Sequence, residues 1–240
     1  MENKISIKNE NLSNYVMFKL DKLDNEFTEQ ELNEITEIVI DYNNESESCF
    51  VFLEELLKLK KLKAITIRNG YIYNDNYNIF SKLANLTEIV FQNCEFEDTD
   101  MITTLNIQSL SLINCKIYSY SFVNILEELT ELTIINGNIE LEKINMLNKL
   151  KYLQISYSNI IANANLNIER LEELYIDNTN INNFEFLNYL PNLKRISIDE
   201  SQFNSNRKLF INLMKKNILI MNENMVEFGG ENNEKTRLSI

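Results

Sequence analysis

The sequence predicts an α/β solenoid, in which tandem repeats each add one short strand to a curved parallel sheet and return along the opposite, convex side. A phrase of spaced leucines and isoleucines occurs eight times in the 240 residues. From Leu86 onward its copies begin every 21 or 22 residues. The chain has only four Gly and one Pro but many Asn, a residue that tolerates left-handed turns. Eight repeats and their caps predict a sheet of about eight to ten strands.

The repeated phrase has the form L-x-x-L-x-L, followed by a small residue at its ninth position and an apolar residue at its eleventh. The clearest copy contains Leu171, Leu174, Ile176, Thr179 and Ile181. Residues two apart lie on the same side of a strand, so the fourth and sixth positions face one core. One repeat cannot bury that side alone, and stacking joins the repeats into a continuous core. The copies begin at Ile35, Leu62, Leu86, Ile107, Leu129, Leu150, Leu171 and Leu193.

This phrase resembles the leucine-rich repeat superfamily, specifically its short-repeat class of internalin-like and phosphatase-regulator-like repeats. The resemblance covers roughly residues 27–221. It implies a leucine-rich repeat solenoid that binds its partner on the concave face of the sheet. The ninth position, commonly Asn in this superfamily, is Asn only at Asn43, and the first two spacings are long, at 27 and 24 residues. The other ninth residues are Gly70, Cys94, Cys115, Gly137, Ser158, Thr179 and Ser201.

Both ends of a solenoid need caps, because an open end would expose the core. Thr28 and Glu31 form a capping-box signature that predicts a short helix before the first strand. Residues 12–23 are expected to cover the first coil, as either a strand or a helix. The predicted organisation is one structural domain with an N-terminal cap (1–34), eight repeats (35–204), a C-terminal cap (205–226) and a polar tail (227–240).

Regular helices are expected where the chain has residues beyond the repeat. The long first two spacings predict helices over 50–59 and 77–83, because apolar residues follow a helical period there. Near the C-terminus, residues 207–216 form an amphipathic pattern that predicts a helix, and residues 217–221 resemble a strand.

Charge and cysteine content restrict the partners and the compartment. The net charge is −13, which disfavours nucleic acid and anionic membranes and favours a protein with a basic patch. Residues 1–11 lack the apolar run of a signal peptide, and no apolar stretch of about 18 residues is present. Three Cys without metal-type spacing indicate a reducing environment. We therefore expect a cytoplasmic monomer that does not enter a membrane.

The composition also argues against most catalytic sites. The chain has no His, which removes the commonest general base and zinc ligand, and its four Gly assemble neither a phosphate-binding loop nor a dinucleotide fingerprint. No catalytic, cofactor-binding or metal-binding residue is predicted. Cys94 and Cys115 occupy equivalent positions in adjacent repeats. They are either a redox pair or half of a metal site, or buried unreactive thiols, and the last interpretation is favoured. Cys49 has no partner in the pattern.

The third, fifth and seventh positions of each strand point to the concave face, and the eighth lies at the strand edge. Acidic residues outnumber basic ones there by eight to two, and tyrosines gather in the C-terminal half. Tyrosine and carboxylate side chains together suit a partner that carries Arg or Lys. The alternative is that the tyrosines only cover the sheet and the acids are solvated. The predicted partner-binding residues are Ile113, Ile135, Tyr152, Tyr157, Glu173, Tyr175, Asp177, Asp199 and Glu200.

The eighth position repeats one residue type, which predicts a structural feature. Five of the eight copies have Asn at this position. Stacked amides can hydrogen-bond to one another along the sheet edge and help the chain turn out of the strand. These residues are Asn69, Asn93, Asn114, Asn136 and Asn178.

The predicted function is a non-catalytic protein–protein interaction module that binds a basic partner through an acidic, tyrosine-bearing concave face. A narrower alternative is an inhibitor or immunity protein that neutralises a toxin or another enzyme by occlusion. Two alternatives of other classes are a hydrolase that uses paired carboxylates and a rigid structural spacer.

Overall fold

The computed structural model describes residues 4–42, 53–72, 80–161, 166–181, 183–222 and 224–228. The predicted ninth-position Asn43, the thiol of Cys49 and the tail beyond residue 228 lie outside the described residues. Contacts divide the chain into two compact units, Met1–Leu129 and Thr130–Ile240, and each unit is described by itself.

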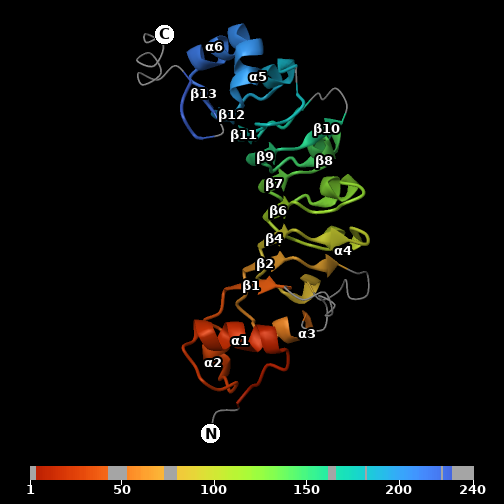
Figure 1. Cartoon of the computed structure of the whole chain (residues 1–240), viewed down its shortest axis with the longest axis vertical. Helices are drawn as coiled ribbons and strands as arrows, with labels where there is room; N and C mark the ends of the chain where they lie inside the picture. The colour runs from red at the N-terminus through yellow and green to blue at the C-terminus, as the bar shows by residue number, and fades with distance from the viewer. Residues whose placement is uncertain are drawn as a thin grey trace. The chain divides into compact units, whose positions relative to one another are not determined.

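The first unit contains four parallel strands that each cover the third to the seventh position of a repeat. They pair in register, so that Glu37 of one strand lies beside Ala64 of the next. In Figure 1 these strands are stacked in chain order. The fourth and sixth positions are buried in all four, as at Ile89 and Phe91. The strands are β1 (Glu37–Asp41), β2 (Ala64–Arg68), β4 (Glu88–Gln92) and β6 (Ser109–Ile113).

The second unit continues the same pattern over five parallel strands. Third positions again lie side by side, as Glu131, Tyr152 and Glu173 do. The eight strands predicted from the repeat are therefore all present, and the strand expected over 217–221 is confirmed as a shorter one. The strands are β7 (Glu131–Ile135), β9 (Tyr152–Ser156), β11 (Glu173–Tyr175), β12 (Arg195–Ser197) and β13 (Leu219–Met221).

The return segments are mostly 3-10 turns, which differs from the regular helices expected over 50–59 and 77–83. Of the first range only residues 53–59 are described, and the helix there ends at Leu56. Of the second, residues 80–83 are described, and Phe80–Lys82 form a 3-10 turn. A 3-10 turn rises more per residue than an α-helix, so it spans the return path with fewer residues. The segments are α3 (Leu53–Leu56), α4 (Asp100–Thr103), η1 (Phe80–Lys82), η2 (Ser121–Ile125), η3 (Leu141–Met146) and η4 (Glu185–Tyr189).

Two short parallel ladders that the sequence did not predict follow the main strands. In the first unit β3 (Tyr71–Ile72) pairs with β5 (Glu95–Phe96), and in the second β8 (Asn138–Glu140) pairs with β10 (Asn159–Ile161). The Asn180 amide closes the outer edge of β10. Its Oδ1 accepts from the Ile160 N–H at 2.7 Å and its Nδ2 donates to the Ile160 carbonyl at 3.0 Å. One side chain thus pairs with the backbone as a neighbouring strand would.

The N-terminal cap settles the alternatives left open for residues 12–23. Residues 12–19 lie in helix α1 (Glu10–Lys19), which begins after the N-cap Asn9, and residues 20–23 follow the helix. Helix α2 (Glu29–Leu32) follows, and its predicted capping box is confirmed by reciprocal hydrogen bonds between Thr28 and Glu31. The Thr28 backbone N–H, with Lys22 and the Thr28 hydroxyl, lowers the pKa of Glu31 to about 2, so this carboxylate stays charged at neutral pH.

Two helices follow β12, in the range where the sequence predicts the end of the eighth repeat and the start of the C-terminal cap. Helix α5 (Glu200–Ser205) replaces the return segment of the eighth repeat, and helix α6 (Arg207–Lys215) confirms the predicted amphipathic helix. Beyond β13 the chain turns back, so that Met221 and Glu227 form an antiparallel bridge. The Phe228 ring stacks on that of Phe203 at 4.3 Å between centroids. This return covers the last strand edge, which would otherwise offer unpaired backbone groups.

The predicted amide ladder is present in the first unit. Asn69 Nδ2 donates to Asp41 Oδ1 at 2.7 Å, and Asn93 Nδ2 donates to Asn69 Oδ1 at 3.0 Å. Asn114 Nδ2 in turn donates to Asn93 Oδ1 at 3.2 Å. All three Asn residues have φ between 53° and 56°, in the left-handed region that Asn tolerates best after Gly. The eighth position therefore turns the chain and links neighbouring repeats.

Two substitutions separate these roles at Asn93. Asn93→Gly keeps access to the left-handed conformation and loses the ladder, so we expect a loss of unfolding free energy below about 1 kcal/mol. Asn93→Ala loses both the ladder and the easy access to the left-handed conformation. We therefore expect its loss of unfolding free energy to be larger by about 1–2 kcal/mol. Urea denaturation of both variants measures the difference. Equal losses would mean that the backbone conformation is not what selects Asn.

Three ninth-position side chains contact a carbonyl of the preceding repeat, whereas the Thr179 hydroxyl donates to the Ile176 carbonyl of its own repeat. The Cys94 thiol donates to the Ile67 carbonyl and the Cys115 thiol to the Phe91 carbonyl, both at 3.4 Å. In the second unit the Ser158 hydroxyl donates to the Ser156 carbonyl of its own repeat at 2.8 Å, and its oxygen lies 3.5 Å from the Ile134 carbonyl of the preceding repeat. The two cysteines are 1% and 7% exposed. The hydrogen bond between the two thiols lowers the pKa of Cys94 and raises that of Cys115, and burial raises the pKa of both. These contacts agree with the interpretation of both cysteines as buried, unreactive thiols.

Thiol labelling tests that interpretation. In a Cys49→Ser chain, a thiol reagent such as Ellman's reagent is expected to modify almost none of the thiol in the native state and two thiols per chain in urea. The reason is that only the exposed thiolate reacts, and Cys94 and Cys115 are buried. Rapid native-state labelling, or a disulfide in the folded protein, would contradict it.

Candidate functional site

The site lies on the outward face of the sheet in the second unit, which we call the exposed sheet face: the side chains at the third, fifth and seventh positions of the repeats that contain β7, β9, β11 and β12. At its centre the rings of Tyr152 and Tyr175 lie 5.1 Å apart between centroids, at an angle of 37°. The Tyr175 hydroxyl donates to Glu173 Oε2 at 2.9 Å. The same oxygen accepts from Arg195 Nη1 at 3.0 Å. Two tyrosines, a carboxylate and a guanidinium thus form one connected cluster.

A chain of hydrogen bonds extends from this cluster across the strands. The Tyr152 hydroxyl donates to Gln154 Oε1 at 3.0 Å, and Gln154 Nε2 donates to Ser156 Oγ at 3.3 Å. The Ser156 and Ser197 hydroxyls both donate to Asp177 Oδ1, each at 3.3 Å. Burial, and then the neighbouring Tyr175 and Glu173, raise the pKa of Tyr152 to about 12, so its hydroxyl stays protonated and can donate.

Two of the predicted contact residues are more buried than expected. Tyr175 and Asp177 were placed among outward positions, and their side chains are only 5% and 6% exposed. Neighbouring strands lie about 4.8 Å apart, so large side chains on one strand cover those on the next. Tyr152, which lies half-buried beside Tyr175, covers it in this way. Both residues therefore support the surface from below.

Tyr157 is the most exposed of the predicted tyrosines, at 60%. It occupies the eighth position with φ 52°, where five other repeats carry Asn. Its backbone N–H donates to the Asp177 carbonyl at 3.2 Å, which places it at the edge of the exposed sheet face. A bulky residue in the left-handed region is a genuine outlier and is energetically unfavourable. The turn therefore does not require a tyrosine at this position.

The predicted pair Asp199 and Glu200 does not lie on a strand. Asp199 is the N-cap of α5, and its Oδ1 accepts from the Gln202 N–H at 2.8 Å. Its Oδ2 accepts from the Asn178 N–H at 3.3 Å. Glu200 is exposed in the first turn of α5. The carboxylate of Asp199 is therefore used by the fold, and that of Glu200 is accessible.

The two predicted isoleucines are half-buried. Ile113 is the last residue of β6 in the first unit, and Ile135 is the last residue of β7 in the second. Each ends its strand at the edge where the chain turns. Their exposure is smaller than the sequence suggested, because both lie at seventh positions beside neighbouring strands.

A shallow pocket of about 360 Å³ opens beside Tyr152, where the chain enters β7, β9 and β11. Glu131 provides an exposed carboxylate there, whereas Glu172 is paired with Lys194. A half-buried ring beside a carboxylate is a suitable environment for the cationic end of a Lys or Arg side chain. The pocket is lined by Thr130, Glu131, Lys151, Tyr152, Glu172 and Glu173.

Several residues of the site were not singled out from the sequence. Gln154, Ser156, Arg195 and Ser197 connect the tyrosines to Asp177. Each stands at an outward position of the phrase, so the pattern placed them on the correct face. Ser156, Arg195 and Ser197 make hydrogen bonds to residues of other repeats, which could not be inferred from one repeat, whereas Gln154 bonds to its neighbours within β9.

Within the described part of the chain, no group of three or more Cys, Asp and Glu side chains is placed to hold a metal ion. None of the helices described is long and apolar enough to span a bilayer.

The in-register parallel strands, the buried fourth and sixth positions and the ninth-position hydrogen bonds define a leucine-rich repeat fold, and comparison with known proteins confirms this assignment. No family model matches the chain. Over 150 residues, 61% of the chain, it is 31% identical to a leucine-rich repeat-containing protein of Amsacta moorei entomopoxvirus. The chain spans only 27% of that protein's length.

Solved structures of two Listeria monocytogenes internalins share the fold. The internalin inlF superposes with a TM-score of 0.61 at 21% identity, over 79% of this chain and 56% of that one. Internalin C2 superposes with a TM-score of 0.60 at 20% identity, over 85% of this chain and 93% of that one. The predicted α/β leucine-rich repeat solenoid is therefore confirmed.

Proposed function

We propose that the chain is a non-catalytic protein-binding module that holds a basic patch of its partner on the exposed sheet face. The observation that carries the proposal is Tyr157, an exposed ring held in a backbone conformation that favours Asn. Leucine-rich repeat folds commonly serve as protein-interaction modules, which supports the general role. The proposal that the partner is basic and binds the exposed sheet face rests on the residues of the second unit.

The side chains that a partner can reach are different from those that are buried. Tyr157 presents a large rigid ring, and Glu131 and Glu200 present carboxylates to solvent. The buried Tyr175 and Asp177 are held by hydrogen bonds to Glu173 and to the Ser156 and Ser197 hydroxyls. A surface whose side chains are already fixed loses little conformational entropy on binding. Tyrosine is enriched at binding hot spots, and carboxylates around it favour Arg and Lys of the partner.

The test compares two matched tyrosine substitutions. Tyr157 and Tyr189 are 60% and 62% exposed, and only Tyr157 lies beside the exposed sheet face. Immobilised wild-type protein, Tyr157→Asn and Tyr189→Asn are exposed to lysate of the native host, and captured proteins are identified by mass spectrometry. A partner is then purified and its affinity is measured by calorimetry at several salt concentrations.

The proposal requires a partner that binds wild-type protein and Tyr189→Asn but not Tyr157→Asn, with an affinity that falls as salt rises. Equal retention by the two variants, or binding that is insensitive to salt, would exclude this surface as the binding site. An enzyme or toxin that loses activity in the complex would establish the narrower inhibitor role. Turnover of a glycan or peptide panel by the chain alone would support a hydrolase instead.

A further inference from the structure

The outward side of helix α6 is a basic surface in an acidic chain. Residues 207–216 contain four cations and no carboxylate, whereas the whole chain has a net charge of −13. All four cations are exposed, and none of them forms an ion pair or a side-chain hydrogen bond within the described part of the chain. In Figure 1 this helix lies at the C-terminal end of the second unit. The cations are Arg207, Lys208, Lys215 and Lys216.

These cations surround one exposed apolar side chain. Phe210 and Leu213 turn the other side of α6 toward the core, where both are buried. Lys208, Ile211 and Lys215 follow one another by three and four residues, so they share the outward side of the helix. Ile211, which is 37% exposed, therefore lies between two lysines that are about 10 Å apart along the helix axis. We call Ile211 and the four cations the basic helix face.

The first turn of α6 differs from that of the other described α-helices. Each of those has a carboxylate in its first turn, where the positive end of the helix dipole favours a negative charge. Helix α6 has Arg207 and Lys208 there instead, and the Asn206 side chain makes no capping hydrogen bond. Because two cations at this end weaken a helix, the fold does not require them.

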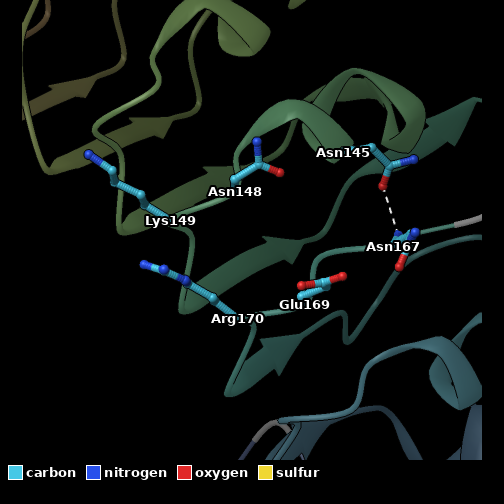
Figure 2. A pocket seen from close by; sticks show the side chains of 6 residues that line it. All are labelled: Asn145, Asn148, Lys149, Asn167, Glu169 and Arg170. Atoms are coloured by element: carbon cyan, nitrogen blue, oxygen red, sulfur yellow. Dashed lines mark hydrogen bonds between the residues drawn. The ribbon is translucent and has the colours of Figure 1, made fainter.

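The second unit has another surface with two cations, the polar groove of about 530 Å³ shown in Figure 2. The Glu169 carboxylate lines this groove together with Arg170, and Lys149 already interacts with another group of the protein. The Asn167 N–H also donates to Asn145 Oδ1 there, at 2.8 Å. The charges of the groove are thus partly balanced from within, whereas those of the basic helix face are not.

We propose that the basic helix face binds an acidic segment of a protein, in which an apolar residue lies between carboxylates. In an extended segment, carboxylates two residues before and after an apolar residue share its side and lie about 13 Å apart. Lys208 and Lys215 are long and flexible enough to reach both carboxylates. Ile211 then contacts the apolar residue, and Arg207 and Lys216 are placed to pair with further carboxylates of the segment.

Other anionic partners fit this helix less well. An amphipathic helix that binds a membrane inserts a broad apolar side into the lipid. The apolar side of α6 is instead used by Phe210 and Leu213 in the core, which leaves Ile211 alone on the outward side. A second copy of the chain has the same net charge of −13, so the two copies repel one another on approach.

Backbone amide shifts in the ¹⁵N-labelled full chain test the proposal. The probe is the peptide acetyl-Asp-Glu-Leu-Glu-Asp-amide. Its counterparts are acetyl-Asn-Gln-Leu-Gln-Asn-amide, which lacks the charges, and acetyl-Asp-Glu-Ser-Glu-Asp-amide, which lacks the apolar residue. We expect saturable shifts at Lys208, Ile211 and Lys215 with the acidic leucine peptide, weaker binding of the serine peptide and no shifts with the neutral one. The affinity should fall as salt rises.

Lys208→Glu is the decisive variant, because it gives α6 the first-turn carboxylate of the other described helices. We expect a higher melting temperature and an affinity for the acidic peptide that is about fivefold lower, since one ion pair is lost and a repulsion is added. Lys82→Glu makes the same change of charge at an exposed position of η1 and should leave the affinity unchanged. If Lys208→Glu lowers the melting temperature, Lys215→Gln tests the same surface without reversing a charge.

Four results would overturn the proposal. Equal weakening by Lys208→Glu and Lys82→Glu would show a response to net charge alone. Equal affinity for the leucine and serine peptides would remove Ile211 from the site. Binding to phosphatidylserine vesicles without binding to the peptide would identify a lipid surface instead. Self-association in sedimentation velocity that is lost in Lys208→Glu would identify a second copy as the partner. None of these outcomes bears on the exposed sheet face, which is tested by Tyr157→Asn.

Discussion

Replacing Tyr157 by Asn is expected to stabilise the fold and to weaken partner binding at least ~30-fold, the size of a hot-spot residue. Stability rises by about 0.5–1 kcal/mol because Asn adopts the left-handed backbone with less strain than Tyr. Binding falls because the exposed ring, 60% accessible, is lost. A variant that folds better and binds worse separates function from stability.

Urea denaturation and calorimetry with the purified partner measure the two effects. Tyr189→Asn is the matched control and should change neither quantity much, since Tyr189 is equally exposed and lies in η4. Loss of stability in Tyr157→Asn would show that the Tyr157 ring supports the fold. Unchanged binding would remove Tyr157 from the interface.

Replacing Asp177 by Lys is expected to lower the free energy of unfolding by about 3 kcal/mol or more. Asp177 is 6% exposed and accepts hydrogen bonds from Ser156 and Ser197, so a lysine there would lose both bonds and bury an unpaired cation. Asp177→Asn keeps a carbonyl oxygen as the acceptor and should cost only about 1 kcal/mol.

Glu200→Lys makes the same charge reversal at an exposed position of α5 and is the control for Asp177→Lys. It should change stability by less than about 0.5 kcal/mol. Similar, small losses in the two lysine variants would mean that the buried carboxylate does not stabilise the fold. Because Asp177→Lys destabilises the surface that it would probe, only Asp177→Asn is suitable for testing whether Asp177 contacts the partner.

The fold could be predicted because the repeat is a local pattern. The phrase from Leu171 to Ile181 contains a complete strand and the turn that follows it. Its eight copies imply stacking without any knowledge of distant contacts. The capping box of Thr28 and Glu31 was equally local and is confirmed. The short ladders β3–β5 and β8–β10 were missed, since two or three residues carry no periodicity.

The site was predicted less well, because exposure depends on neighbours in other repeats. Tyr175 and Asp177 were placed on the correct face, but their burial comes from side chains about twenty residues away, such as Ser197 and Tyr152. Asp199 was expected at a strand end and caps α5 instead. Whether these residues bind a partner stays a prediction.

The sequence by itself determined which side chains face the core, since alternation within a strand and the 21- or 22-residue repeat decide this locally. Only the tertiary structure decided which outward side chains remain accessible. Strands about 4.8 Å apart allow a ring or carboxylate on one repeat to be covered by the next, and no single repeat contains that information. Tyr157 stays exposed because it follows the end of its strand, where the chain turns away from its neighbours.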